Sequence, residues 1–351
     1  MSPAPHLPPP ACNIPLHTRL RTLPWLMVFV LLAFLAGLAG TLSAVAWLLP
    51  QAPLMPFFTT QVNRVEESTL EQDTIDDIES RLAHVYDKQK KIADNYYPKN
   101  ASVGTLVLLT SDGWGVMSYP SYQVGQEKNW EIYDAQGNIR TIEKVIVDPL
   151  TKFLYVNLSG QGFRVVSFVT DESVVTKEGI WVREGDRYQL RTELRHELQS
   201  GDKAFAIWQP NRVLRFASTV NAAHPLFSTN GQFLGFTRDG YVETSWLIPY
   251  TLSLILEKGT PQYSGLLFDG MFVEKSTAKN RSDEFAFVVT QVRSKTKDDI
   301  KVGDVILRIQ GNTFDADSLS RQILTAPQDM TLTILRAGKQ IDVKVKKTIV
   351  L

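Results

Sequence analysis

The chain has 351 residues, which exceeds one average domain and predicts two or three folded units. Basic residues (Lys, Arg) and acidic residues (Asp, Glu) both number 37, so the net charge gives no support for a nucleic-acid partner. The single cysteine, Cys12, excludes an internal disulfide and a cysteine-cluster metal site. The five histidines lack HExxH-type spacing and no glycine-rich phosphate loop is present, so neither a metal nor a cofactor is predicted.

Residues 25–49 form an apolar run without a charge. As a helix this run would span roughly 37 Å, against about 30 Å of hydrocarbon core, which predicts one transmembrane helix. Arg19 and Arg21 precede it, so residues 1–24, which begin proline-rich and are expected to be disordered, are placed in the cytoplasm. Everything after Pro50 is then extracytoplasmic. The run is longer than the apolar part of a signal peptide, which favours an uncleaved anchor in the cell membrane.

Residues 50–100 are predicted to form a spacer that contains a helix over residues 61–91. An apolar stripe supports this helix: Ile75, Ile78, Leu82 and Val85. The stripe covers about two heptads, which is too short to indicate a coiled coil. We therefore expect a solvated helix that packs on the next domain.

After residue 100 short alternating apolar runs are separated by Gly, Asp-Gly or Asn-Gly, which indicates an all-β barrel or sandwich. Its predicted strands include residues 106–110, 142–147, 154–158, 164–169, 203–208 and 232–236. A helix at residues 246–258 closes this domain, whose predicted bounds are 101–260. A second domain, 262–351, has predicted strands at residues 285–292, 305–309, 331–336 and 341–345, and a helix at residues 315–324.

The C-terminal domain carries the most specific motif. Lys301-Val302-Gly303-Asp304-Val305-Ile306-Leu307, followed by Ile309 and Gly311, resembles the K-x-G-D-V-I-L-x-I-x-G signature of PDZ domains. Its two glycines suit tight turns on either side of a buried strand. The resemblance implies a PDZ domain over residues 262–351, which binds C-terminal or unfolded peptide segments by adding them as a strand to a sheet edge.

The same resemblance implies a peptide-binding site. In the family a Y-Φ-G-Φ loop offers backbone amides to a terminal carboxylate; here it reads Tyr263-Ser264-Gly265-Leu266, with a serine at one apolar position. Leu266 and Phe268 are expected to line the pocket. Leu319 and Ile323 lie four residues apart on the predicted helix, and are expected on one face across the groove. The alternative is that these apolar residues belong to the core.

The middle domain resembles the trypsin-like barrel of the HtrA (high-temperature-requirement) serine proteases. Residues 104–114 are similar to that family's first hairpin, residues 147–151 to its D-P-x-T-D segment, and residues 225–236 to the strands after its nucleophile. Ile248-Pro249 matches the helix that leads to the PDZ domain. The resemblance implies a mostly β fold: a single N-terminal transmembrane helix, a trypsin-like double β-barrel and a C-terminal PDZ domain.

The catalytic residues of that family are replaced. A trypsin-like enzyme needs a serine nucleophile, a histidine base and an orienting aspartate. The nucleophile position falls on Ala222, the aspartate position on Lys152 and the histidine position near Pro120. A methyl group, an ammonium and a proline ring supply none of this chemistry.

The count of histidines supports the same conclusion. The resembled fold takes its base from the first barrel, yet no histidine lies between His84, in the predicted spacer helix, and His196. His224, two residues after Ala222, is expected to fill space. We expect a pseudoprotease that serves as a peptide-binding scaffold, adaptor or sensor in envelope protein quality control, with active HtrA-type proteases among its partners. The alternatives are a divergent active serine endopeptidase and a structural subunit of a homotrimer.

Overall fold

The computed structural model describes residues 70–169, 178–185, 187–192, 194–198, 203–216, 223–238, 241–242, 245–274, 285–293, 300–316 and 318–351, together with residues 27, 28, 31 and 33. Residues 67–351 form one compact unit. The predicted tail at residues 1–24 lies outside the described residues, as does nearly all of the predicted transmembrane helix at residues 25–49. Within the described part of the chain, no helix has the length and apolar character needed to cross a membrane.

The prediction of a helix over residues 61–91 is wrong for most of residues 70–91, the part of this range that the structure describes. Helix α2 spans Gln72–Glu79, and strand β1 follows at Leu82–Asp87. Leu82 and Val85 are fully buried because β1 pairs with β2 on one side and with β4 on the other. Their spacing of three residues fits a helix as well as a strand with both faces covered, so the local pattern alone could not decide between them. The middle domain therefore begins before residue 101.

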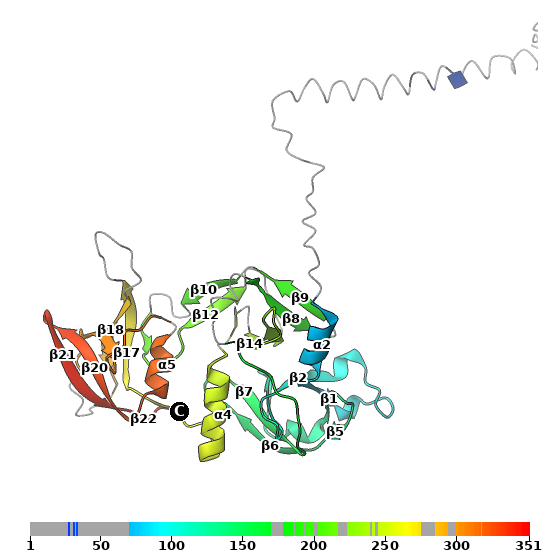
Figure 1. The fold of residues 1–351 in the computed structure, drawn as a ribbon, viewed down its shortest axis with the longest axis horizontal. Coiled ribbons are helices and arrows are strands. Elements are labelled where there is room, and N and C mark those ends of the chain that lie inside the picture. Colours follow the sequence, from blue (N-terminus) through cyan, green and yellow to red (C-terminus); the bar gives the residue numbers. More distant parts are fainter. Residues whose placement is uncertain are drawn as a thin grey trace, which may run out of the picture. The chain divides into compact units, whose positions relative to one another are not determined.

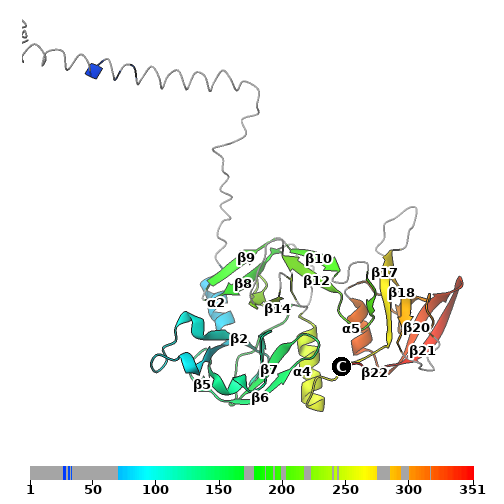
Figure 2. The ribbon, with the colours of Figure 1, turned by 180° about the vertical axis from the view of Figure 1, so that it is seen from behind.

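Two antiparallel sheets form the middle domain (Figures 1 and 2). Their strand orders are β5-β4-β1-β2-β3-β7-β6 and β10-β12-β15-β14-β13-β8-β9. The first sheet contains, besides β1, the strands β2 (Ser102–Leu108), β3 (Trp114–Ser118), β4 (Trp130–Tyr133), β5 (Ile139–Arg140), β6 (Ile142–Val147) and β7 (Phe153–Leu158). The second contains β8 (Ile180–Glu184), β9 (Arg187–Arg191), β10 (Leu194–Leu198), β12 (Arg212–Phe216), β13 (Pro225–Phe227), β14 (Phe233–Arg238) and β15 (Tyr241–Val242).

Each of these sheets has a hydrophobic core of its own, and a further core joins them. Leu106, Met117 and Leu154 belong to the core of the first sheet, and Val182 and Leu226 to that of the second. The joining core combines side chains of both sheets and of helix α4, among them Trp114, Phe153, Phe227, Phe236, Ile248 and Ile255. This arrangement gives two barrel-like halves that are packed against each other.

Helix α4 spans Leu247–Lys258, close to the predicted bounds. Pro249 is tolerated because it lies in the first turn, where its missing N–H would have no intrahelical partner. Gly259 ends the helix with φ 77°, a left-handed cap that glycine adopts without strain. The helix also contacts the C-terminal domain, because the Tyr250 hydroxyl donates to the Leu324 carbonyl at 2.8 Å.

The C-terminal domain is built on a six-stranded sheet of order β11-β17-β18-β19-β20-β21. The elements after α4 are β16 (Ser264–Gly265), β17 (Phe268–Glu274), β18 (Phe285–Val292), β19 (Val305–Ile309), α5 (Ser318–Thr325), β20 (Asp329–Arg336), β21 (Lys339–Lys346) and β22 (Thr348–Ile349). The predicted strands at residues 285–292 and 305–309 are confirmed at these bounds. Helix α5 buries Leu319 and Ile323 in the same core as the sheet.

One strand of this sheet comes from the middle domain. The prediction of a barrel strand over residues 203–208 is wrong. Only Phe205–Ala206 forms a strand, β11, and it pairs antiparallel with β17 of the C-terminal domain instead of with a strand of the barrel. The alternation of apolar residues marked an extended segment but contained no information about which edge it would join. The strand predicted over residues 164–169 is also wrong, since this stretch is irregular apart from a bridge between Phe168 and Phe233.

Candidate functional site

Two of the three predicted catalytic positions lie at one end of the first sheet. Strands β3 and β7 pair with Ser118 opposite Phe153, so Pro120 and Lys152 lie just beyond the same end of the ladder. Both residues are exposed. Ala222, the predicted nucleophile position, lies outside the described residues. No proton acceptor stands at either described position.

The turn that carries Lys152 is held by a buried aspartate. Asp148 accepts the Thr151 hydroxyl at 2.5 Å and the Leu150 N–H at 3.0 Å. Lys152 itself adopts a left-handed backbone with φ 64°, and its N–H donates to the Asp148 carbonyl at 2.9 Å. The Asp148 oxygen that accepts the Leu150 N–H also accepts the Tyr263 hydroxyl, at 2.9 Å. The turn is therefore a fixed structural joint to the C-terminal domain.

His224 lies directly before β13 and is held by Thr237 of β14. Its N–H donates to the Thr237 hydroxyl oxygen at 2.9 Å, and the Thr237 N–H donates back to its carbonyl. Burial lowers the pKa of His224 below its ordinary value; Glu184 opposes this shift and Arg183 adds to it. A half-buried, neutral imidazole agrees with the predicted space-filling role.

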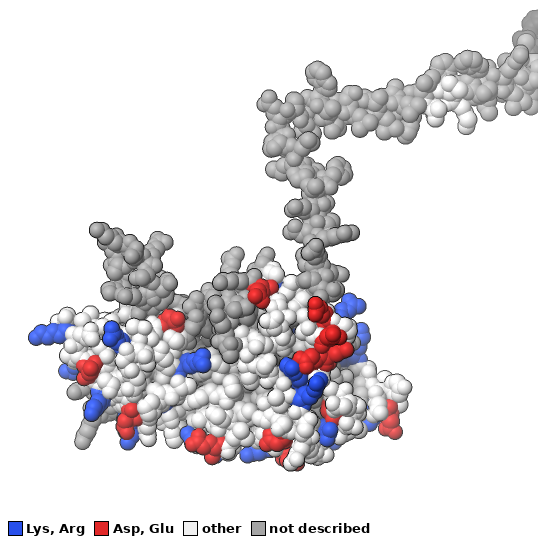
Figure 3. Space-filling model, in the orientation of Figure 1, with Lys and Arg blue, Asp and Glu red and all other residues white. Residues whose placement is uncertain are grey.

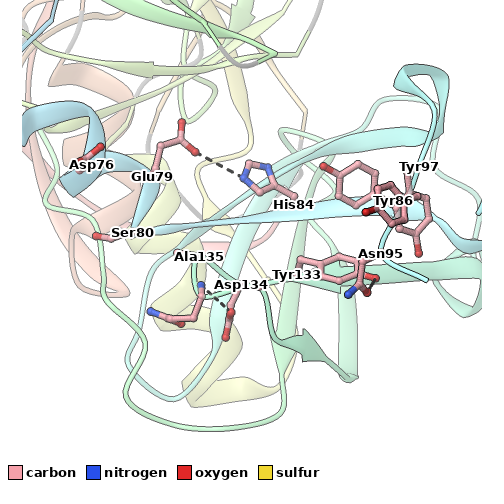
Figure 4. Close-up of a pocket in the computed structure, with 13 residues that line it drawn as sticks. Asp76, Glu79, Ser80, His84, Tyr86, Asn95, Tyr97, Tyr133, Asp134 and Ala135 are labelled. Atoms are coloured by element: carbon pink, nitrogen blue, oxygen red, sulfur yellow. Dashed lines mark hydrogen bonds and ion pairs between the residues drawn. The ribbon is translucent and has the colours of Figure 1, made fainter. Parts of the chain in front are cut away.

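A pocket of about 750 Å³ lies beside β1 (Figure 4). Glu79 reaches from α2 toward His84 of β1, whose Nε2 lies 3.6 Å from its carboxylate, and three tyrosines group at the far side of the imidazole. These are Tyr86, Tyr97 and Tyr133. The first two rings stack at 4.6 Å, with the third edge-on. The prediction that placed His84 in a spacer helix is wrong, because it lies in the first strand of the first sheet.

Glu79 forms most of the polar contacts between α2 and the second sheet. Arg183, which is buried, donates to its carboxylate through two nitrogens at 2.6 and 3.1 Å, and the Tyr188 hydroxyl donates at 2.6 Å. Burial alone would raise the pKa of Glu79, but the hydrogen bonds from His84, Arg183 and Tyr188 lower it to about 2. Ser80 in the same pocket donates its hydroxyl to the Asp77 carbonyl. The contacts of Glu79 and His84 therefore join α2 to both sheets, and the hydroxyl that donates to Glu79 is that of Tyr188.

The surface around α2 is acidic on the face that Figure 3 shows, with basic side chains next to it. The helix and the residue before it contribute Glu71, Asp73, Asp76, Asp77 and Glu79. Elsewhere on this face residues of both signs are interspersed. Among the described residues no group of histidine, cysteine, aspartate and glutamate side chains is suited to hold a metal ion.

The structure brings the predicted peptide-binding residues together in one core. Tyr263, Gly265, Leu266, Phe268, Leu319 and Ile323 are buried, and Ser264 is half-buried. The five apolar side chains of this set share a hydrophobic cluster with Ala206, Ile207 and Trp208. None of these three residues was predicted for the site; the alternating pattern over residues 203–208 was the signal for them, but it did not identify a partner.

The predicted carboxylate loop is engaged by the chain itself. Strand β16 pairs with β22, with Ser264 opposite Ile349. The Tyr263 N–H donates to the Leu351 carbonyl at 3.1 Å, and its carbonyl accepts the Val350 N–H at 2.9 Å. The Tyr263 hydroxyl is buried between Asp148 and Thr251. Tyr263 therefore connects the barrel to the C-terminal domain.

The comparisons with known proteins extend this description of the fold. No family model matches the chain, and no curated protein matches it. The solved structure of the HtrA-type protease AlgW with a tripeptide is similar at a TM-score of 0.53 and 13% identity, covering 79% of this chain and 97% of that chain. The structure of AlgW with a decapeptide is similar at a TM-score of 0.52 and 12% identity, covering 79% and 98%. Over the 79% of the chain that these structures cover, this chain has the fold of the HtrA-type proteases.

Proposed function

We propose that this chain is a membrane-anchored, catalytically inactive relative of the HtrA-type proteases. It binds extended peptide segments through a PDZ-type C-terminal domain and works as a scaffold, adaptor or sensor in envelope protein quality control. The anchor is the apolar run at residues 25–49, and the two domains after it are extracytoplasmic.

One observation carries the loss of catalysis. The positions that correspond to the base and the orienting acid of the fold are Pro120 and Lys152, at the shared end of β3 and β7. A serine hydroxyl is a poor nucleophile at neutral pH unless a base accepts its proton. Removing the nucleophile or the base of such a triad costs about a million-fold in turnover.

A divergent active enzyme would have to recruit His84. This is the histidine of the first sheet, and it has a carboxylate partner in Glu79. That carboxylate, however, is already held by Arg183 and Tyr188, and the nearby Ser80 hydroxyl donates to a backbone carbonyl. The contacts around His84 support a structural joint better than a catalytic dyad.

Two observations support peptide binding. Similar solved structures are HtrA-type proteases with a tripeptide and with a decapeptide. In this chain, β17 and α5 contribute buried side chains to one apolar core, and a short extended segment of the chain is paired with β17 and buried in that core. Pairing an extended segment with a sheet edge is the way in which PDZ domains bind peptides.

The test of inactivity uses the purified full-length protein in detergent. It is incubated with unfolded casein and, separately, with a fluorophosphonate probe, while the protease AlgW serves as the positive control. We expect neither cleavage nor labelling, because no base activates a serine. Labelling that disappears when a single serine is replaced by alanine would establish an active enzyme instead.

A further inference from the structure

The edge of β17 is filled by a segment of the same chain. Phe205 lies opposite Gly270 and Ala206 opposite Asp269, in an antiparallel arrangement. The Ile207 N–H donates to the Phe268 carbonyl at 3.3 Å, which extends the pairing by one residue. Without this segment β17 would be the unpaired edge of the sheet, since its other side is occupied by β18.

The side chains of this segment are buried where a peptide would bind. Phe205 packs against Phe272 and Phe287, with ring centroids 5.4 and 5.5 Å apart. Ile207 is fully buried and Trp208 is 5% exposed. Trp208 lies against Gly265, so closely that a Cβ added to this glycine would stand 2.6 Å from the indole Cγ. Gly265 is thus required by the contact with Trp208.

The direction of the segment is that of an antiparallel peptide running toward the loop before β17. From Phe205 to Trp208 it passes Gly270, then Phe268, and reaches Gly265. It then turns away, because the Gln209 N–H donates to the Ala206 carbonyl at 2.9 Å. The segment therefore leaves the edge of β17 at the place where a peptide with a free carboxylate would end.

We propose that residues 203–208 are an internal ligand that closes the peptide groove of the C-terminal domain, and that an external peptide binds only after displacing them. This inference rests on the proposed peptide-binding function and adds its regulation. The groove should then prefer external peptides that resemble the internal ligand Phe205-Ala206-Ile207-Trp208. Such peptides have an aromatic residue at the first position, an aliphatic residue at the third and an aromatic residue at the fourth. A free carboxylate is not needed, since the internal ligand has none.

The segment is suited to be displaced. Its strand has two residues, and the flanking hydrogen bond of 3.3 Å is beyond the usual N–H···O range. Most of its attachment therefore comes from three side chains, those of Phe205, Ile207 and Trp208. A peptide that supplies equivalent side chains, together with more strand pairing along β17, competes for the same contacts.

A reversible disulfide tests this proposal on the full-length protein. Since Ile207 and Phe268 form a hydrogen-bonded pair, the neighbouring residues Ala206 and Asp269 form a non-hydrogen-bonded pair, whose Cα atoms are about 4.5 Å apart in antiparallel sheets and can be bridged. The variant combines Ala206→Cys and Asp269→Cys with Cys12→Ser. The probe is a fluorescent peptide with the sequence of residues 203–209 and both ends blocked, with a scrambled peptide as its control.

We expect the oxidised protein to form the intramolecular disulfide, detected by mass spectrometry, and to bind the probe at least ten-fold more weakly than the same protein after reduction. Each single-cysteine variant should bind equally with and without reductant. If the disulfide does not form, or if the oxidised and reduced proteins bind the probe equally, the proposal that residues 203–208 are an internal ligand would be wrong. If the disulfide forms but the protein binds no probe, either oxidised or reduced, the proposed peptide-binding function would be wrong. In that case β11 would be a permanent strand of the sheet.

Discussion

At the scale of single residues, the structure explains side chains whose roles the motifs left open. Gly265 was predicted as a loop glycine that exposes backbone amides. In the structure it gives room to Trp208, and its neighbour Tyr263 extends a hydroxyl to the buried Asp148. Glu79, which no motif indicated, holds the buried Arg183.

The contact between Gly265 and Trp208 predicts a specific coupling. Gly265→Ala places a methyl 2.6 Å from the indole Cγ, so the free energy of unfolding should fall by about 1–3 kcal/mol, as in overpacked cores. In a Trp208→Gly background, which removes the ring and also the Cβ that would stand 2.7 Å from the new methyl, the same substitution should cost almost nothing. Gly104→Ala is the matched control, because its methyl would meet only the end of the Met117 side chain at 3.0 Å. Urea unfolding of the four variants measures this, and equal costs in both backgrounds would contradict the contact.

Glu79 predicts how stability depends on pH. Its pKa is lowered to about 2 from the ordinary value of 4.5, so the folded state binds fewer protons than the unfolded state between these pH values. The stabilisation is complete above pH 4.5 and is lost as the pH falls toward 2, amounting to about 3 kcal/mol at most. Glu79→Gln should lower the free energy of unfolding by about 3–5 kcal/mol at pH 7, because it leaves Arg183 buried without its partner.

The measurement is urea unfolding of wild type and Glu79→Gln at several pH values. The difference between the two curves should shrink as the pH falls below 4.5. Glu197→Gln is the matched control, since it belongs to an ion pair with Arg215 in which both side chains are about half exposed, and such pairs contribute little. A difference that is independent of pH would refute the role of Glu79.

At the scale of elements, buried polar contacts join the barrel to the C-terminal domain. The Tyr263 hydroxyl meets Asp148 from the turn before β7 and Thr251 from α4. Within the C-terminal domain, at the C-terminal end of α5, the Lys347 ammonium donates to the carbonyls of Ile323, Leu324 and Ala326. Burial lowers the pKa of Lys347 to about 8, with a smaller effect of Lys258. These contacts satisfy groups that would otherwise be buried without partners.

Tyr263→Phe should lower the free energy of unfolding by about 1–3 kcal/mol, because it removes a donor from the buried Asp148 carboxylate. Thermal or urea unfolding checks the change. Tyr133→Phe serves as the control, since its hydroxyl donates to Asn95 at an exposed position. If both substitutions had the same effect, the contact with Asp148 would not be the joint that we describe.

At the scale of the whole molecule, the proposed membrane anchor predicts how the chain is oriented. Arg19 and Arg21 precede the apolar run, so the C-terminus should be extracytoplasmic. A reporter enzyme that works only outside the cytoplasm should therefore be active when it is fused after Leu351. A fluorescent reporter that matures only in the cytoplasm should stay dark. The reverse result would place both folded domains in the cytoplasm. Moving the two arginines to the other side of the run is the matched variant, and should invert both readouts.

Much of the fold could be predicted because its signals are local. The strands at residues 285–292 and 305–309 and the helix α4 follow from alternation, from turn glycines and from the cap at Gly259. The proposal that Pro120 and Lys152 stand at catalytic positions rests only on the motif and its register, and it stays a prediction. The position of His84 was missed because an apolar spacing of three residues fits both a helix and a strand that is covered on both faces.

By itself, then, the sequence determined most of the strands and helix α4, since these depend on residue identity and short-range spacing. Only the tertiary structure decided where those segments bind. Phe205–Ala206 joins β17 because the edge of that strand is unpaired and Gly265 leaves room for Trp208. The partner of a short strand depends on which edge and which cavity lie within its reach, and these are set by residues more than 50 positions away in the chain.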